Sequence, residues 1–213
     1  MGTLEGTRIG DAVSKVISAM SVSVDGYITG RDPGPGRGLG DGGMLFDWYF
    51  DGDVRSQVFG GFALSEPSAR VFDAAARRVG ATIAGRNTYD DSDRFADTGS
   101  PQANVPLFVL SHRAAPNAGG LQTVITTGID DAVAAAKAAA GDKDVALMGG
   151  GVVTEALKAG LIDEIILHQV PVLLGGGRSY FQTLPAHIRL QLVDVVAAPG
   201  VTHLHYSVTK DAA

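Results

Sequence analysis

Residues 145–181 read VALMGGGVVTEALKAGLIDEIILHQVPVLLGGGRSYF, and the rest of the chain can be interpreted around the pattern that they contain. A short apolar run meets the three glycines at 149–151, and apolar residues then recur at helical spacing as far as Gly160. A second apolar run, residues 164–174, ends in another triple glycine. The pattern predicts a strand, a glycine turn, a helix and a second strand.

The first glycine triplet has two interpretations. Because glycine lacks a Cβ atom, its backbone can lie directly against a ligand, and the unpaired N–H groups at a helix start favour a phosphate or pyrophosphate. A tight strand-to-helix turn, in which glycine merely fits, is equally consistent with residues 149–151. Their spacing matches neither the dinucleotide-binding GxGxxG pattern nor a Walker loop, so both interpretations remain open.

Composition limits the classes of function. The chain has 213 residues, a formal net charge of −6, no run of Lys or Arg, and no cysteine. Disulfides, thiol catalysis and Cys-ligated zinc are therefore excluded, and a nucleic-acid partner, which needs a basic face, is not expected. We also expect no metal site, no membrane partner and a cytoplasmic location, since no apolar segment is long enough to span a bilayer.

We expect a flexible lead-in at residues 1–14, which mix acid, base and glycine, and one domain at residues 15–213. Within this domain, further apolar segments predict strands at residues 15–23, 81–84, 107–110 and 121–126. Helical patterns lie between them at residues 68–79 and 130–140. This alternation indicates an α/β fold with a mixed, mostly parallel sheet, closed by an antiparallel C-terminal hairpin at residues 188–197 and 202–209.

Polar and cationic side chains follow two of these predicted strands, as residues 85–88 (GRNT) and residues 111–113 (SHR). Open α/β sheets bind ligands at the carboxyl ends of their strands, and a fixed cation there can meet an anion. For the arginine of the first group, the alternative is a surface ion pair with Asp90, Asp91 or Asp93.

Residues 31–43 are dense in glycine and proline, so we expect a surface loop long enough to act as a lid or a binding loop. The aromatic segment that follows, residues 44–50, contains the only tryptophan. These side chains either stack on a flat heterocycle or form a hydrophobic plug over the core. Further upstream, Asp25 precedes Gly26 and is more typical of a turn than of a catalytic acid.

Five short motifs in this order resemble the dihydrofolate reductase-like family, in particular the branch with the reductase domain of the riboflavin-biosynthesis deaminase–reductase. They are residues 20–28 (MSVSVDGYI), 85–89 (GRNTY), 110–113 (LSHR), 148–151 (MGGG) and 171–181 (PVLLGGGRSYF). The similarity spans about residues 16–209. It implies a three-layer α/β/α fold, NADPH as the cofactor and, as in many members of that family, a homodimer.

The resemblance also implies which residues bind NADPH. Residues 85–88 and 111–113 would flank the adenine and the 2′-phosphate, residues 149–154 would hold the pyrophosphate, and the first strand with Ile28 would lie along the nicotinamide. The implied cofactor site is Ala19, Ile28, Gly85, Arg86, Asn87, Thr88, Ser111, His112, Arg113, Gly149, Gly150, Gly151, Val152, Val153 and Thr154. Because a 2′-phosphate needs a nearby cation, the two arginines in this set favour NADPH over NADH.

A substrate would lie beside the nicotinamide, between the end of the first strand, the aromatic segment and the second glycine triplet. The substrate residues expected from this placement are Met20, Tyr27, Phe46, Trp48 and Gly176. The candidate proton donors, in decreasing order of preference, are Asp25, Asp47 and Tyr180.

One departure from the family concerns the carboxylate with which dihydrofolate reductases bind the pterin ring. Its position falls near Ser68 and Ala69, and neither Glu66 nor Asp73 matches it, so folate is not favoured. We expect an NADPH-dependent reductase that transfers hydride to a small pterin-, pyrimidine- or flavin-like substrate. Two alternatives remain: a stand-alone 5-amino-6-(5-phosphoribosylamino)uracil reductase of riboflavin synthesis, and a nucleotide-binding protein without catalytic activity.

Overall fold

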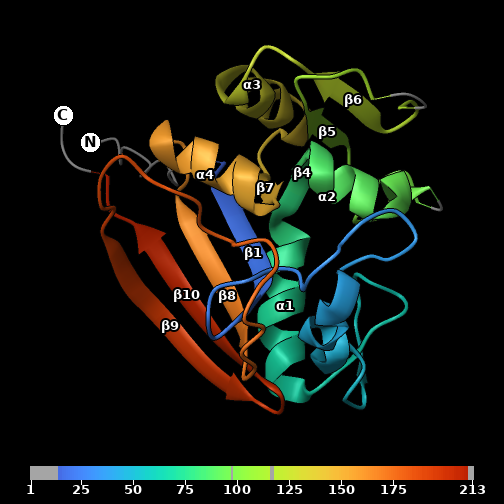
Figure 1. Ribbon diagram of the computed structural model, residues 1–213, viewed down its shortest axis with the longest axis vertical. Helices are drawn as coiled ribbons and strands as arrows, with labels where there is room; N and C mark the ends of the chain where they lie inside the picture. The colour runs from blue at the N-terminus through green and yellow to red at the C-terminus, as the bar shows by residue number, and fades with distance from the viewer. Residues whose placement is uncertain (1–13, 97, 116–117, 211–213) are drawn as a thin grey trace, which may run out of the picture.

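The computed structural model describes residues 14–96, 98–115 and 118–210, so the predicted lead-in lies outside the described residues except for Ser14. An eight-stranded sheet has the order β6-β5-β4-β7-β1-β8-β10-β9 (Figure 1). Its strands are β1 (Val16–Ser23), β4 (Val79–Gly85), β5 (Leu107–Leu110), β6 (Gln122–Ile125), β7 (Asp144–Met148), β8 (Glu164–Val170), β9 (Leu190–Ala198) and β10 (Val201–Val208). Neighbouring strands are parallel, except that β10 is antiparallel to both β8 and β9.

Helical segments connect these strands. They are η1 (Gly40–Tyr49) and η2 (Asp93–Phe95), which are 3₁₀ segments, and the α-helices α1 (Glu66–Arg78), α2 (Arg86–Asp91), α3 (Ile129–Ala140) and α4 (Gly150–Lys158). A short ribbon of β2 (Val54–Arg55) and β3 (Ala63–Leu64) precedes α1.

Helices cover both faces of the sheet. On one face, Val133 of α3 and Val153 of α4 belong to the same core cluster as Ile165 of β8. On the other face, Trp48 of η1 packs in a cluster with Val170 of β8. Because side chains alternate along a strand, Ile165 and Val170 point to opposite faces. The predicted three-layer fold with an antiparallel C-terminal hairpin is confirmed.

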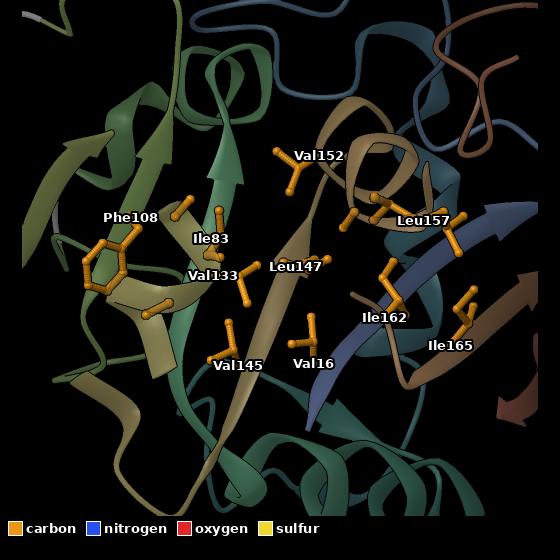
Figure 2. Close-up of a cluster of buried hydrophobic side chains, with 14 of the residues drawn as sticks. Val16, Ile83, Phe108, Val133, Val145, Leu147, Val152, Leu157, Ile162 and Ile165 are labelled. Atoms are coloured by element: carbon orange, nitrogen blue, oxygen red, sulfur yellow. The ribbon is translucent and has the colours of Figure 1, made fainter. Parts of the chain in front are cut away.

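The larger core cluster lies between the sheet and the helices α3 and α4 (Figure 2). Central strands are apolar on both faces, as in other parallel sheets that are covered twice. In β4, for example, the adjacent residues Ile83 and Ala84 are both fully buried. This explains why the central strands read as continuous apolar runs rather than as alternating patterns.

Local signals account for the ends of α1. The Ser65 hydroxyl accepts the N–H of Ser68, Pro67 lies in the first turn, and two arginines occupy the last turn. The helix predicted at residues 68–79 therefore begins two residues earlier. The strand predicted at residues 164–174 is shorter than expected, because β8 ends at Val170.

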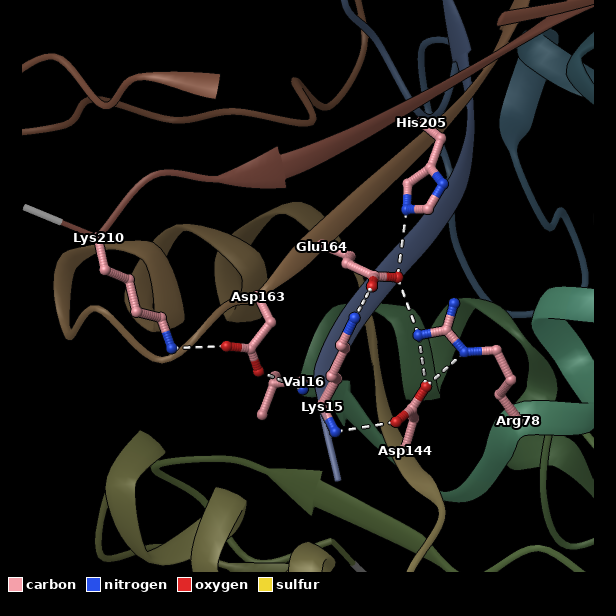
Figure 3. Close-up of polar contacts among 8 residues, drawn as sticks. All are labelled: Lys15, Val16, Arg78, Asp144, Asp163, Glu164, His205 and Lys210. Atoms are coloured by element: carbon pink, nitrogen blue, oxygen red, sulfur yellow. Dashed lines mark hydrogen bonds and ion pairs between the residues drawn. The ribbon is translucent and has the colours of Figure 1, made fainter. Parts of the chain in front are cut away.

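A network of charges ties together the amino ends of β7 and β8 (Figure 3). Arg78, at the end of α1, lies 2.7 Å from the Asp144 carboxylate and 2.9 Å from that of Glu164. The Lys15 ammonium lies 2.5 Å from Glu164, and His205 Nε2 lies 3.2 Å from it. Burial of Glu164 acts to raise its pKa, but the hydrogen bonds from Lys15 and Arg78 outweigh burial and hold that pKa below its usual value.

The outer strand β9 leaves apolar side chains exposed. Leu190, Leu192 and Val195 are 39%, 53% and 48% exposed and lie opposite β10 residues in the antiparallel ladder. An exposed apolar strip on an edge strand is typical of an interaction surface.

Among the described residues, no helix has both the length and the apolar character needed to cross a membrane.

Candidate functional site

A cavity of about 1440 Å³ runs along β1 and past the carboxyl ends of β4, β5 and β7. Both predicted strand-end groups, residues 85–88 and 111–113, line it, as do residues 149–152. This is the edge at which open α/β sheets bind ligands. The volume exceeds that of a typical site for one drug-sized ligand, so the cavity has room for a dinucleotide and a second ring.

The first two glycines after β7 are required by packing. Gly149 has a φ of +104°, and a Cβ atom there would lie 2.2 Å from the Thr88 hydroxyl oxygen. A Cβ atom on Gly150 would lie 2.4 Å from the carbonyl oxygen of Ser179. For these two residues, the interpretation as a tight turn is therefore sufficient.

Gly151 differs, because packing does not require it. It is exposed, it lines the cavity, and a Cβ atom there would meet nothing closer than 3.8 Å. It belongs to the first turn of α4, whose N-cap residue, Gly149, provides no side-chain hydrogen bond. The N–H groups at this helix start are available to an anion, and the helix dipole favours negative charge there. Val153 and Thr154, also implied as cofactor residues, are buried outside the cavity wall.

The two predicted cations differ in availability. Arg86 donates from Nε to the Asp90 carboxylate at 2.8 Å and from Nη1 to the Ala114 carbonyl at 2.6 Å. The alternative interpretation, an ion pair with a nearby aspartate, is therefore present in the structure. Arg113 is exposed on the cavity wall and forms no ion pair with any described residue. The Ser111 hydroxyl shapes this turn by donating to the Arg113 carbonyl at 2.7 Å. Arg113 is thus the more available partner for an anion.

The aromatic segment is divided between the core and the cavity wall. Trp48 is only 3% exposed, lies outside the cavity wall and donates its indole N–H to the Ser21 hydroxyl at 3.1 Å. Phe46, Tyr49 and Phe50 line the cavity beside Met20. Part of the segment is therefore a core plug, and part is a wall of the site. Ala19 and Ile28, implied as nicotinamide contacts, also line the cavity.

None of the three candidate proton donors lies on the cavity wall. The Asp25 carboxylate accepts from the Ser23 hydroxyl at 2.6 Å and from the N–H of Gly175 at 2.7 Å, and the Ser23 hydrogen bond helps to lower its pKa. Asp47 is exposed outside the cavity. Tyr180 is fully buried, which raises its pKa, and it donates to the Ser18 hydroxyl at 2.7 Å. The structure therefore gives no support to these three roles.

Three of the five expected substrate residues also lie outside the cavity wall: Trp48, which is in the core, and Tyr27 and Gly176. Tyr27 forms a bridge with Ser179, and a Cβ atom on Gly176 would lie 3.1 Å from Arg31 Nε. These residues shape the loop beside the cavity rather than the cavity itself.

Contacts between distant segments surround the cavity, and no sequence signal indicates them. Arg31 donates to the Gly175 carbonyl at 3.0 Å, Arg178 forms an ion pair with Asp91, and the Gly36 N–H donates to the Asp93 carboxylate at 2.8 Å. Together they join the loop at residues 31–43, the second glycine loop and the end of α2. The predicted surface loop does contribute to the cavity wall, through residues such as Arg37 and Leu39.

The wall that α1 contributes is apolar. Phe72, Ala75 and Ala76 of α1 line the cavity, together with Val79 at the start of β4. The apolar spacing that predicts this helix also marks the face that lines the cavity. Asp73 points elsewhere: its carboxylate accepts from the Ser56 hydroxyl at 2.5 Å and from the Gln57 N–H at 2.8 Å. The predicted absence of a pterin-binding carboxylate at this helix is consistent with the geometry.

The solved structures that are similar to this chain include the following three. A protein of Shewanella sp. PV-4 named for riboflavin biosynthesis is 25% identical, with a TM-score of 0.67, over 92% of this chain and 99% of its own. A pyrimidine reductase-like protein of Corynebacterium diphtheriae is 14% identical, with a TM-score of 0.60, over 93% of both chains. RibD of Acinetobacter baumannii is 18% identical, with a TM-score of 0.55, over 93% of this chain and 58% of its own.

Comparison with curated proteins gave no match. The family model described as the RibD C-terminal domain matches residues 14–204, nearly the whole described chain. The similarity of fold to the Shewanella structure, over 92% of this chain, includes the sheet and its antiparallel hairpin. This chain therefore belongs to the RibD C-terminal domain family and has its dihydrofolate reductase-like fold.

Proposed function

We propose that this protein is an NADPH-dependent reductase that transfers hydride to a small planar substrate. The observation that carries the proposal is one cavity that combines an uncapped helix start, an arginine without an acidic partner among the described residues, and an aromatic wall. The first two suit the phosphates of a dinucleotide, and the third suits a flat ring beside it. The name of the similar Corynebacterium diphtheriae protein, pyrimidine reductase-like, also supports the proposal.

Each part of the cavity has a role in this proposal. The start of α4 at Gly151 holds the pyrophosphate, Arg113 and His112 meet the 2′-phosphate, and Ala19 and Ile28 orient the nicotinamide. NADPH, when bound, supplies the hydride. The residues of the chain bind it, orient it and exclude water from the reacting face.

Calorimetric titration with NADPH and NADH tests the cofactor site. We expect the wild type to prefer NADPH, and we expect Arg113→Ala to lose about tenfold or more in NADPH affinity with little change for NADH, since one charge-assisted contact to phosphate is lost. Arg86→Ala should lose less, because Arg86 is already paired with Asp90. Arg70→Ala, an exposed position on α1, is the matched control. Absence of binding of either nucleotide to the wild type would contradict the proposal.

A second candidate is reduction of the ribosylamino-pyrimidine of riboflavin synthesis by this chain alone. The names of the similar Shewanella and Corynebacterium proteins favour it. Turnover of that pyrimidine, and not of dihydrofolate, would support this candidate. Nucleotide binding without NADPH oxidation by any acceptor would instead favour the non-catalytic alternative.

We further propose a homodimer formed through the exposed apolar strip of β9. A strip of this kind on one edge of the sheet suits a second copy of the same chain, because a two-fold axis pairs identical patches. Light scattering should give a dimer for the wild type and a monomer for Leu192→Lys. A monomeric wild type at micromolar concentration would exclude this interface.

A further inference from the structure

The aromatic wall of the cavity is built by three segments: η1, the turn before β3, and α1. Tyr49 and Phe62 are stacked, with ring centroids 4.5 Å apart and an interplanar angle of 20°. Phe72 lies 5.2 Å from Tyr49, and Phe59 stacks on Phe62 at 5.3 Å. Phe50 is 60% exposed, so solvent reaches one side of this wall. Such a surface accommodates a flat ring while one edge of the ring stays accessible to water.

The charges around this wall disfavour a cationic ring. Within the described part of the chain, the acids that line the cavity are Asp91 and Glu155, and both are paired, with Arg178 and Lys158 respectively. Arginines, among them Arg37, line the same cavity. A positively charged substrate would meet no unpaired carboxylate there, whereas a neutral ring requires none.

One hydroxyl in the wall remains free to donate. The Trp48 indole N–H can only donate, so the Ser21 hydroxyl accepts from it at 3.1 Å. Ser21 then directs its own hydrogen to the Tyr49 oxygen at 3.5 Å. This leaves the Tyr49 hydrogen available to the cavity, which Tyr49 lines. Burial raises the pKa of Tyr49 to about 12, so the phenol stays protonated at neutral pH.

We propose that Tyr49 donates a hydrogen bond to a carbonyl oxygen of the substrate, and that the substrate is a neutral planar ring carrying that carbonyl. This rests on the reductase function proposed above. Ser21, which orients the Tyr49 hydroxyl, lies two residues after Ala19 on β1, so the two side chains point to the same face of the sheet, and both line the cavity. Because Ala19 is one of the residues proposed above to orient the nicotinamide, the Tyr49 hydroxyl and the nicotinamide lie on the same face of β1 in this proposal.

The reaction balances without a carboxylic acid. Hydride adds to a ring carbon that bears the carbonyl or is conjugated with it, and the displaced π electrons move onto the carbonyl oxygen. Tyr49 stabilises this oxyanion by its hydrogen bond, and the oxyanion takes one proton from water at the exposed side. The sum is NADPH plus H⁺ plus substrate, giving NADP⁺ and the substrate with two added hydrogens.

The test uses menadione, a neutral planar quinone, as the probe. We expect the wild type to reduce it with NADPH, and Tyr49→Phe, which removes only the hydroxyl, to lower kcat by about 10- to 100-fold while changing KM and NADPH affinity by less than about threefold. Tyr206→Phe, on β10 and outside the cavity wall, is the matched control and should match the wild type. Between pH 6 and about 9, kcat should stay flat, because Tyr49 stays protonated.

Ligand binding gives a second readout that needs no cofactor. Trp48 is the only tryptophan, and its ring lies 4.1 Å from that of Tyr49, so a ring on the aromatic wall should quench its fluorescence. Menadione should bind more tightly than the planar cation N-methylquinolinium. Equal or tighter binding of the cation, or a Tyr49→Phe variant as active as the wild type, would overturn this inference. So would a wild type that binds NADPH but does not reduce menadione, and in that case the cofactor site would stand.

Discussion

The two ends of the parallel sheet carry charge in different ways. At the amino ends of β7 and β8, Asp144 and Glu164 are both paired with Arg78, and Lys15 completes the network (Figure 3). At the carboxyl ends, Arg113 faces a large cavity without an acidic partner among the described residues. One sheet therefore has paired acidic side chains at its amino ends and an exposed arginine at its carboxyl ends.

The charges at the two ends of the sheet should contribute to different properties, those at the amino end to stability and those at the carboxyl end to ligand binding. Paired charges at the amino end satisfy one another and hold neighbouring strands in place, so they attract no ligand. An unpaired cation beside an uncapped helix start leaves a positive potential that an anionic ligand can use. Substitutions at the amino end should therefore change the free energy of unfolding, and substitutions at the carboxyl end should change affinity.

The largest effect is expected for Gly150→Ala, which should alter both properties. Its Cβ atom would lie 2.4 Å from the Ser179 carbonyl oxygen and 2.7 Å from that of Tyr180, so the backbone must shift, at a cost of about 1–3 kcal/mol. Gly151→Ala is the matched control, because space is open there. It should keep the melting temperature but weaken NADPH binding. Equal melting temperatures for the two variants would contradict the packing argument.

Glu164→Gln should destabilise the fold by about 1–2 kcal/mol, since its partners are partly exposed and screened. NADPH affinity should not change. The folded-state pKa of Glu164 lies below its ordinary value of 4.5, so its contribution is present above that pH and is lost as the pH falls through the folded-state value. Urea unfolding at pH 7 and at lower pH measures this. A difference between variant and wild type that persists at the lowest pH would argue against the ion-pair explanation.

Ionic strength should affect ligand binding at the carboxyl end of the sheet more than stability at its amino end. Raising ionic strength from about 0.01 M to about 1 M shortens the Debye length from about 30 Å to about 3 Å. NADPH affinity should fall severalfold, because Arg113 is exposed, and NADH affinity should fall less. Thermal unfolding should respond less than NADPH affinity, because the Asp144 and Glu164 carboxylates are buried even though their partners Lys15 and Arg78 are partly exposed. Equal salt dependence for both nucleotides would mean that no cation meets the 2′-phosphate.

The smallest effect is expected for Lys210→Ala, also at the amino end of the sheet. Lys210 pairs with Asp163 at 2.6 Å, but its side chain is 53% exposed. Such surface pairs contribute about 0–1 kcal/mol. A loss as large as that of Glu164→Gln would show that burial does not separate the two pairs.

Local patterns in the sequence were sufficient for the class of fold and for the polar half of the site. Apolar runs, glycines after strands and cations at strand ends are features of a few neighbouring residues, and parallel strands bring their carboxyl ends to one edge. The structure brings residues 85–88, 111–113 and 149–152 to one cavity, but Val153 and Thr154 lie outside its wall. The binding roles of these residues stay predictions. The homodimer and the choice of NADPH stay predictions.

The remaining features depend on contacts between segments far apart in the chain. Whether Trp48 or Tyr49 faces the cavity depends on how η1 lies against α1 and β8. From the sequence, Asp25 was a candidate proton donor. In the structure, its carboxylate instead accepts hydrogen bonds from the N–H groups of Leu174 and Gly175. Arg178 and Asp91 are 87 residues apart. Periodicity records which face of an element is buried, but it does not record which distant group that face meets, because that depends on the packing of the whole chain.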